Sequence, residues 1–204
     1  YFATRGWAFL DLNYRGSTGH GRAYMEVLRG NWGATDVDDA LSAARYLCDA
    51  DLADPDRMVL CGGSAGGYTV LRTLTAYPGS FRAGLCLYGI SNLFSLAADT
   101  HKFEAHYLYS LLGPLPQSAP LYRERSPLFA ADNIRDPIAF FQGSEDRVVP
   151  PAQAEEIVAN LRRRGVPHAY RLYEGEGHGW RRSETIEQFY RDVDSFLKEH
   201  VLFA

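Results

Sequence analysis

A serine, an aspartate and a histidine follow one another along the chain at points where short apolar runs end. They are Ser64, Asp146 and His178. A free serine hydroxyl is a weak nucleophile and needs a base to take its proton. A histidine can accept that proton and return it to a leaving group, and a carboxylate can fix the tautomer of the imidazole. These three residue types together therefore predict acyl transfer through a serine nucleophile.

The serine lies in a Gly-x-Ser-x-Gly segment made by Gly62, Ser64 and Gly66. A strand-like run, Met58–Cys61, precedes it, and apolar residues at helical spacing follow it. A strand that turns abruptly into a helix needs glycine on both sides and holds the serine hydroxyl out at the turn. The N–H of Ala65, at the start of the helix, would then point to where an oxyanion forms. The alternative is a glycine-rich turn without chemistry; a phosphate loop would need Gly-Lys-Ser/Thr, which is absent.

The acid and the histidine each begin as ambiguous residues. Taken alone, Asp146 could be a turn former and His178 a surface histidine. Each, however, follows a predicted strand, and the order serine, acid, histidine is one that hydrolases use. Glu145 is the rival acid, but the Val-Val-Pro sequence that follows Asp146 favours Asp146. No cluster of His, Cys and Asp has metal-ligand spacing, so we expect neither a metal nor a cofactor.

The elements that must position these residues alternate between buried apolar strands and amphipathic helices. Because such alternation is typical of a parallel sheet with helices on both faces, the carboxyl ends of the strands should share one edge. The predicted strands are Trp7–Leu12, Met58–Cys61, Ala83–Tyr88, Pro137–Gln142 and His168–Tyr173. The main predicted helices cover about 66–76, Ala152–Arg164 and Glu184–His200, with an apolar helical face at Ala40, Leu41, Ala44 and Leu47. Short helices are expected over 92–112, followed by an irregular, proline-rich connector from Pro114 to Pro127.

Composition excludes several classes of protein. The chain has 204 residues, 46% hydrophobic and 23% charged, which suits one globular domain. A net charge of −4 gives no reason to expect nucleic acid or an anionic membrane as a partner. No apolar run approaches the roughly 18 residues of a membrane span, and we expect no signal peptide, because the first residues lack its basic segment and long apolar core. Cys48, Cys61 and Cys86 fit neither a disulfide framework nor a zinc site, so we expect reduced thiols and a cytoplasmic setting.

Motifs spread over nearly the whole chain resemble the catalytic domain of the prolyl oligopeptidase family of serine peptidases, especially its acylaminoacyl-peptidase and dipeptidyl-aminopeptidase-like members. They are Leu12–Gly21, Gly30–Gly33 with Asp36, Asp38 and Asp39, Asp54–Arg57, the Gly62–Gly67 turn, Tyr88–Asn92, Arg125–Pro127, Gln142–Pro150 and Glu174–Gly179. The resemblance implies an α/β-hydrolase fold over 1–204, the triad Ser64, Asp146 and His178, and an oxyanion donor at the Ala65 N–H. It also implies hydrolysis of short peptides or acyl-peptides, often from the N-terminus.

The chain departs from the family pattern in two ways. Asn92 stands where many members have Asp. The N-terminal β-propeller of the family, the first strands of the hydrolase domain and the His-Gly-Gly or Tyr-Gly-Gly type segment that supplies a second oxyanion donor are not found; Tyr14 belongs to a different part of the pattern. We therefore expect a domain that is partial at its N-terminus, within a longer polypeptide that carries a propeller. The alternative is that copies associate as a homo-oligomer to cover open sheet edges.

Apolar residues from the end of the third predicted strand onward could line a pocket for the substrate side chain, although core packing is the alternative for each of them. They are Tyr88, Leu93, Phe94, Phe103, Tyr107 and Val149. Two other functions stay open. One is a carboxylesterase with the same triad, because the fold does not separate esters from amides; the other is a catalytically silent structural module.

Overall fold

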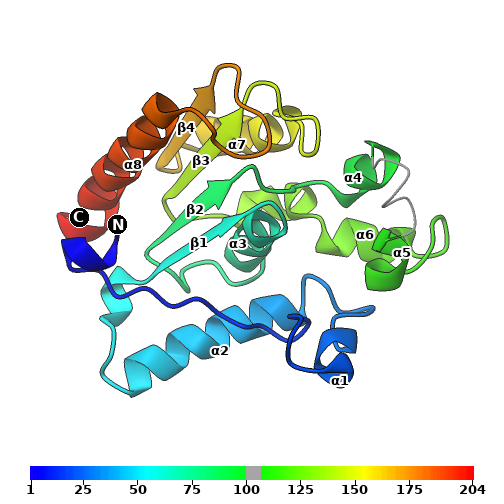
Figure 1. Ribbon diagram of the computed structural model, residues 1–204. Coiled ribbons are helices and arrows are strands. Elements are labelled where there is room, and N and C mark those ends of the chain that lie inside the picture. The colour runs from blue at the N-terminus through cyan, green and yellow to red at the C-terminus, as the bar shows by residue number, and fades with distance from the viewer. Residues whose placement is uncertain (100–106) are drawn as a thin grey trace.

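The core of the molecule is a four-stranded parallel sheet, seen in the computed structural model, which describes residues 1–99 and 107–204 (Figure 1). Its strands are β1 (Val59–Gly63), β2 (Ala83–Leu87), β3 (Ile138–Gly143) and β4 (His168–Tyr173), and they lie side by side in chain order. The register pairs Val59 with Ala83 and Ile138 with His168. Since all four strands run the same way, their carboxyl ends meet at one edge.

Helices cover both faces of the sheet, as the alternation of strands and helices predicts (Figure 1). On one face, α3 (Ala65–Ala76) and α7 (Ala152–Arg164) bury Leu71, Leu74 and Ile157 against Phe140. On the other face, α8 (Ser183–Leu197) buries Val193 and Phe196 against Phe141. Phe140 and Phe141 are consecutive residues of β3, so their side chains point to opposite faces. The fold class predicted from the sequence, α/β with a parallel sheet and helices on both faces, is confirmed.

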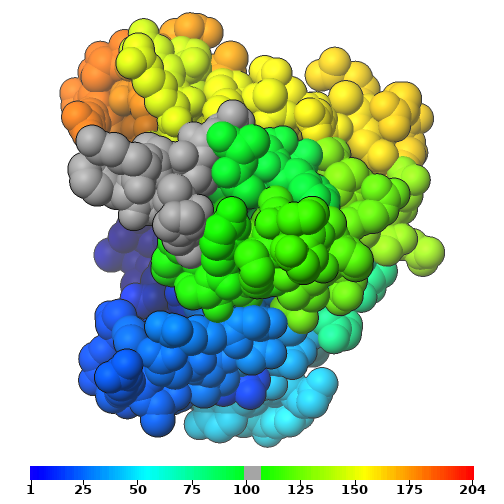
Figure 2. Space-filling model, turned by 90° about the vertical axis from the view of Figure 1, so that its right-hand side faces the viewer, coloured from blue at the N-terminus to red at the C-terminus, as the bar shows by residue number. Residues whose placement is uncertain are grey.

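The remaining elements pack around the sheet and these three helices. They are η1 (Ala3–Arg5), α1 (Arg22–Glu26), α2 (Thr35–Asp49), η2 (Pro55–Arg57), α4 (Leu93–Asp99), α5 (Tyr107–Leu112), α6 (Ala119–Arg125), η3 (Pro127–Asn133) and η4 (Lys198–Leu202). In Figure 2 the green segment that includes α5 and α6 lies between the blue N-terminal part and the yellow and orange later part. A third buried cluster, which includes Trp32, Tyr68 and Tyr122, joins α4, α5 and α6 to α3.

Two expectations about local structure are wrong. The connector from Pro114 to Pro127 is not wholly irregular, because it contains α6. Pro120 lies in the first turn of that helix, where the missing N–H of proline costs nothing.

The larger error is at Trp7–Leu12, which forms no strand. Within the described residues no strand pairs with this segment or with the outer edge of β1. The side chain of Trp7 packs against the α8 side of the core, but Phe9 and Leu10 are 66% and 50% exposed. An apolar run becomes a strand only when a neighbouring strand takes its hydrogen bonds, so this run remains a coil beside an open edge.

The described helices include none that combines the length and the apolar character needed to cross a membrane.

Candidate active site

Ser64 occupies the turn between β1 and α3, and its backbone is strained. Its φ of 55° and ψ of −118° are unusual for any residue except glycine. The Ser64 N–H is nevertheless held, because it donates to the carbonyl of Leu87 at 2.9 Å. The strained turn lifts the hydroxyl off the carboxyl end of β1, which is the geometry of a nucleophile elbow.

The glycines around this turn have different structural roles. A Cβ on Gly62 would lie 2.4 Å from the carbonyl oxygen of Gly66, so no side chain fits there. A Cβ on Gly67 would lie 2.7 Å from the Cα of Gly89, where α3 passes close to the end of β2. A Cβ on Gly66 would meet nothing within 4 Å. Glycine is therefore required at Gly62 and Gly67, and the sequence expectation that Gly66 is sterically required is wrong.

His178 bridges the serine and the aspartate. Its Nε2 lies 2.8 Å from Ser64 Oγ, and its Nδ1 lies 2.8 Å from Asp146 Oδ2. The Asp146 side chain is fully buried, while that of His178 is 23% exposed. Three residues from the loops after β1, β3 and β4 thus form one hydrogen-bonded chain that opens to solvent at the serine.

The Asp146 carboxylate is held by four donors. Oδ1 accepts from the N–H groups of Val148 and Val149, each at 2.9 Å. Oδ2 accepts from His178 and, at 3.2 Å, from Nε2 of Gln142. Burial raises the pKa of Asp146, but the hydrogen bonds from His178 and these N–H groups outweigh it, so the pKa lies below the ordinary value. The acid therefore faces the histidine as a carboxylate.

The loop that carries the acid is fastened to the loop that carries the histidine. The N–H of Ser144 donates to the carbonyl of Tyr173 at 3.0 Å, and its hydroxyl accepts from the N–H of Gly175 at 2.9 Å. The N–H of Glu145 donates to the carbonyl of Glu176 at 2.9 Å. These bonds fix the ends of β3 and β4 to each other, which sets the spacing of Asp146 and His178.

An aromatic pair borders the histidine. Tyr88, the residue after β2, has a φ of 38°, and its ring centroid lies 4.6 Å from that of His178. Trp180 packs against Tyr88 in a T-shaped arrangement, with the ring centroids 5.4 Å apart. This packing limits the rotation of the imidazole and gives one side of the site an apolar wall.

Ala65, expected from the sequence to be the oxyanion donor, directly follows Ser64 at the start of α3. Ala65 is the first residue of α3, so its N–H is one of the four that find no partner within the helix. It is adjacent in sequence to Ser64 and is exposed. A negative charge that develops beside Ser64 Oγ would also be favoured by the positive end of the helix dipole.

The residues expected to line a substrate pocket have different environments. Tyr88 and Phe94 are half-buried, and Tyr107 is 57% exposed. Leu93 and Val149 are fully buried in the cluster around Tyr68 and Tyr122, with Phe94 packed against it. Phe103 lies outside the described residues. Asn92 keeps a local role: its Oδ1 accepts from the N–H groups of Phe94 and Ser95 and so caps α4.

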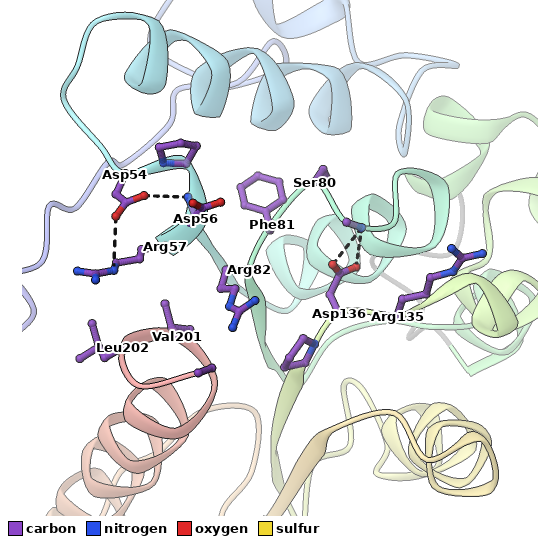
Figure 3. Close-up of a pocket in the computed structure, with 14 residues that line it drawn as sticks. Asp54, Asp56, Arg57, Ser80, Phe81, Arg82, Arg135, Asp136, Val201 and Leu202 are labelled. Atoms are coloured by element: carbon purple, nitrogen blue, oxygen red, sulfur yellow. Dashed lines mark hydrogen bonds and ion pairs between the residues drawn. The ribbon is translucent and has the colours of Figure 1, made fainter.

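A cavity of about 650 Å³ lies at the opposite end of the sheet (Figure 3). Its lining includes Arg57, Arg82 and Pro137, which precede β1, β2 and β3, whereas the chemistry described above follows the strands. Three arginines and three aspartates line it, so their charges balance. The two carboxylate oxygens of Asp136 both accept the N–H of Gly79, Oδ1 at 3.0 Å and Oδ2 at 3.1 Å. Nothing about this cavity connects it to the Ser64 site.

The described residues contain no group of three His, Cys, Asp or Glu side chains arranged to hold a metal ion.

Sequence reasoning did not identify several supporting residues. Gln142 and Glu176 are buried and polar, yet nothing in their local sequence shows which loop they contact. The one local signal for Glu176 is a charged residue between two glycines, two positions before His178. The sequence suggests only a substrate-pocket role for Tyr88, because its contact with His178 depends on a backbone conformation that the sequence does not reveal.

Comparison with known proteins places the chain in a family. Residues 1–202 match the model of the prolyl oligopeptidase family. Dipeptidyl aminopeptidase BIII of Pseudoxanthomonas mexicana is 32% identical over 98% of this chain and 30% of its own length. The human acylamino-acid-releasing enzyme is 30% identical over 96% of this chain and 28% of its own length. Among solved structures, a puromycin-hydrolyzing peptidase of Mycobacterium tuberculosis superposes with a TM-score of 0.91 at 45% identity, over 95% of this chain and 29% of that one. The chain thus spans about 30% of the length of these relatives. It belongs to the prolyl oligopeptidase family.

Proposed function

We propose that this chain is the catalytic domain, over 1–204, of a serine peptidase that cleaves amide bonds in short peptides or acyl-peptides through an acyl-enzyme on Ser64. The observation that carries the proposal is the unbroken hydrogen-bonded chain from Asp146 through His178 to Ser64 at the end of a strained turn. A buried carboxylate, an imidazole and a hydroxyl in that geometry have the arrangement needed for nucleophilic catalysis.

In the first half of the proposed reaction, Ser64 Oγ attacks the carbonyl carbon of the scissile amide while His178 Nε2 takes the hydroxyl proton. The carbonyl oxygen gains the negative charge and accepts the Ala65 N–H. Collapse of the tetrahedral intermediate breaks the C–N bond, and His178 gives its proton to the departing amine. Asp146 holds Nδ1–H throughout and stabilises the imidazolium.

In the second half, a water molecule takes the place of the amine. His178 removes a proton from the water as its oxygen attacks the ester carbonyl, and the proton returns to Ser64 Oγ when the C–O bond breaks. The carboxylic acid leaves and the hydroxyl is restored. No redox partner or cofactor enters this balance.

The relatives suggest the substrate class. The similar proteins are a dipeptidyl aminopeptidase, acylamino-acid-releasing enzymes and a puromycin-hydrolyzing peptidase. We therefore propose that this site releases residues from free or acylated N-termini. Tyr88, Phe94 and Tyr107 would contact the substrate side chain, and Leu93 and Val149 would form the buried support underneath; Phe103 stays a candidate from the sequence alone.

Substrate size belongs to the same proposal. The relatives are much longer than this chain, and the β-propeller expected from the family resemblance would restrict the substrate to short peptides. The complete protein would be assayed with peptide substrates of increasing length. Rates that fall steeply with length would support this part of the proposal, and rates independent of length would contradict it.

The test is a substrate panel assayed on the complete protein and on its Ser64→Ala variant. The panel contains free and acetylated aminoacyl-β-naphthylamides, puromycin and p-nitrophenyl esters. We expect amide turnover by the wild type and almost none by Ser64→Ala. Turnover of esters alone would favour a carboxylesterase. Retained amide turnover in Ser64→Ala would refute the proposed nucleophile, and no turnover of any class by the wild type would favour a silent module.

A further inference from the structure

The histidine of the site lies in a loop that should not hold a side chain still. The loop reads Glu174-Gly-Glu-Gly-His-Gly-Trp180, so a glycine lies on each side of His178 and a third lies at Gly175. Gly175 and Gly179 both have positive φ, at 71° and 108°. Glycine has more conformational freedom to lose than any other residue, and a loop rich in it becomes rigid only when something outside it fixes its shape.

The side chain of Glu176 supplies such a fixture. It is 2% exposed, and its Oε2 accepts the N–H of Arg181 at 3.0 Å. Its Oε1 accepts the N–H of Arg182 at 3.1 Å and the Nε of the same arginine at 3.2 Å. A further side-chain hydrogen bond comes from Thr185. We call these contacts of Glu176 with Arg181, Arg182 and Thr185 the Glu176 clip.

The clip fastens the loop to a rigid element. Arg182 is the residue that precedes α8, and Thr185 lies in the first turn of that helix. The carboxylate therefore lies at the positive end of a 15-residue helix that is packed on the sheet through Val193 and Phe196. Burial by itself would raise the pKa of Glu176, but these hydrogen bonds outweigh burial and bring the pKa down to about 2. The Glu176 carboxylate is therefore charged throughout the neutral range.

The backbone of the same residue reaches the acid loop. The carbonyl of Glu176 accepts the N–H of Glu145 at 2.9 Å, next to Asp146. A Cβ on Gly143 would lie 2.4 Å from that carbonyl oxygen, so the two loops touch closely here. Glu176 thus joins α8, the histidine loop and the acid loop, two residues before His178.

From these contacts we infer that Glu176 is a positioning residue for His178: it holds the imidazole within hydrogen-bond reach of both Asp146 and Ser64 by clipping the glycine-rich loop to the start of α8. Glu176 does not touch the reacting atoms. The inference rests on the proposed function, in which His178 is the base.

The test compares two glutamates of the same loop in the complete protein. Glu176→Gln keeps the size of the side chain but removes its charge and puts an NH₂ group where an N–H already points. Glu174→Gln makes the same chemical change two residues away. The Glu174 side chain is exposed and has no partner among the residues that the structure describes; only its backbone carbonyl is used, by the Arg182 guanidinium.

We expect Glu176→Gln to lower kcat about 10-fold to 100-fold with little change in KM, because a base displaced by about an ångström loses that much. The downfield proton resonance of a His–Asp hydrogen bond at His178 Nδ1 should weaken or disappear, and amide exchange over 175–181 should accelerate. Glu174→Gln should match the wild type in all three measurements.

Arg182→Gln removes the guanidinium contact with Glu176 and leaves the backbone N–H donors of Arg181 and Arg182 in place. It should move the same readouts in the same direction by a smaller factor. The double variant Glu176→Gln/Arg182→Gln should lose less than the product of the two single losses, because both changes act on one contact. If Glu176→Gln does not fold, Arg182→Gln carries the test.

The inference is overturned if a folded Glu176→Gln keeps the wild-type kcat and the Nδ1 resonance. It is also overturned if activity falls only in proportion to the unfolded fraction while the resonance persists. The proton resonance and amide exchange do not require turnover. The two failures are therefore distinguishable. An unchanged Nδ1 resonance in Glu176→Gln would refute the role of Glu176, whereas retained turnover in Ser64→Ala would refute the proposed function.

Discussion

Replacing Asp146 by Asn changes one atom of a carboxylate whose two oxygens face four donors. Oδ1 faces the backbone N–H groups of Val148 and Val149, which cannot turn away. Oδ2 faces His178 Nδ1 and Gln142 Nε2. An asparagine has one acceptor oxygen and one donor nitrogen. Its oxygen must therefore face the two backbone donors, and its NH₂ must take the place of Oδ2.

The NH₂ group then forces the wrong tautomer on the histidine. It can hydrogen-bond to His178 only if Nδ1 is unprotonated, which puts the imidazole proton on Nε2, facing Ser64 Oγ at 2.8 Å. A nitrogen that already carries a proton cannot take the serine proton. The asparagine NH₂ also faces a second donor, Nε2 of Gln142. The Oε1 of Gln142 is buried without a partner among the described residues. Gln142 cannot relieve the clash by rotating its amide, because its Nε2 also donates to the Val149 carbonyl at 3.0 Å.

We expect Asp146→Asn to lower kcat by about 10³ to 10⁴, equivalent to about 4 to 5.5 kcal/mol of transition-state stabilisation, with KM nearly unchanged. The assay is steady-state hydrolysis of the best amide substrate by the complete protein. Glu145→Gln is the matched control, because Glu145 is the adjacent, exposed acid. A variant Asp146→Asn that keeps more than about a tenth of wild-type kcat, or a Glu145→Gln variant that loses it, would refute the reasoning.

Three further predictions concern stability and pH. Glu176 has a folded pKa of about 2 against an ordinary 4.5, so it should contribute up to about 3 kcal/mol of stability above pH 4.5 that is lost as the pH falls towards 2. Denaturation midpoints of wild type and Glu176→Gln should converge over that window, and a constant difference would contradict the assignment. Gly62→Ala should abolish the fold or lower Tm strongly, whereas Gly66→Ala should leave Tm unchanged or slightly higher; equal losses would show that the elbow contacts are wrong. Finally, kcat/KM should rise as the pH increases between about 5 and 8, because only a neutral imidazole can take the serine proton, and a rate that is flat over that range would exclude a histidine base.

The sequence predicts the strands and the loops that follow them because burial and periodicity are local signals. β4 begins and ends where the apolar run predicts, and β1, β2 and β3 differ from prediction by one or two residues at their ends. Strands of a parallel sheet share an edge, so placing Ser64, Asp146 and His178 after three of them was enough to expect that they converge.

What the sequence could not reveal depends on neighbours. Trp7–Leu12 has the apolar content of a strand, but a strand needs a second chain segment beside it, and pairing is not encoded in the run itself. The same limit applies to Glu176, whose role follows from donors five and six residues away that only the folded loop brings to its carboxylate. Gly66 fits the motif, yet the steric requirement lies at Gly67, because the close contact is with the distant Gly89.

The central claim is that Ser64 is a nucleophile activated by His178, and covalent labelling tests it most directly. The complete protein would be treated with a fluorophosphonate, and the adduct would be located by peptide mapping in the wild type and in the Ser64→Ala and His178→Ala variants. We predict one adduct per chain, on Ser64, that is absent from Ser64→Ala and forms far more slowly in His178→Ala. Stoichiometric labelling of Ser64→Ala, or labelling of Ser64 at an unchanged rate in His178→Ala, would contradict the account.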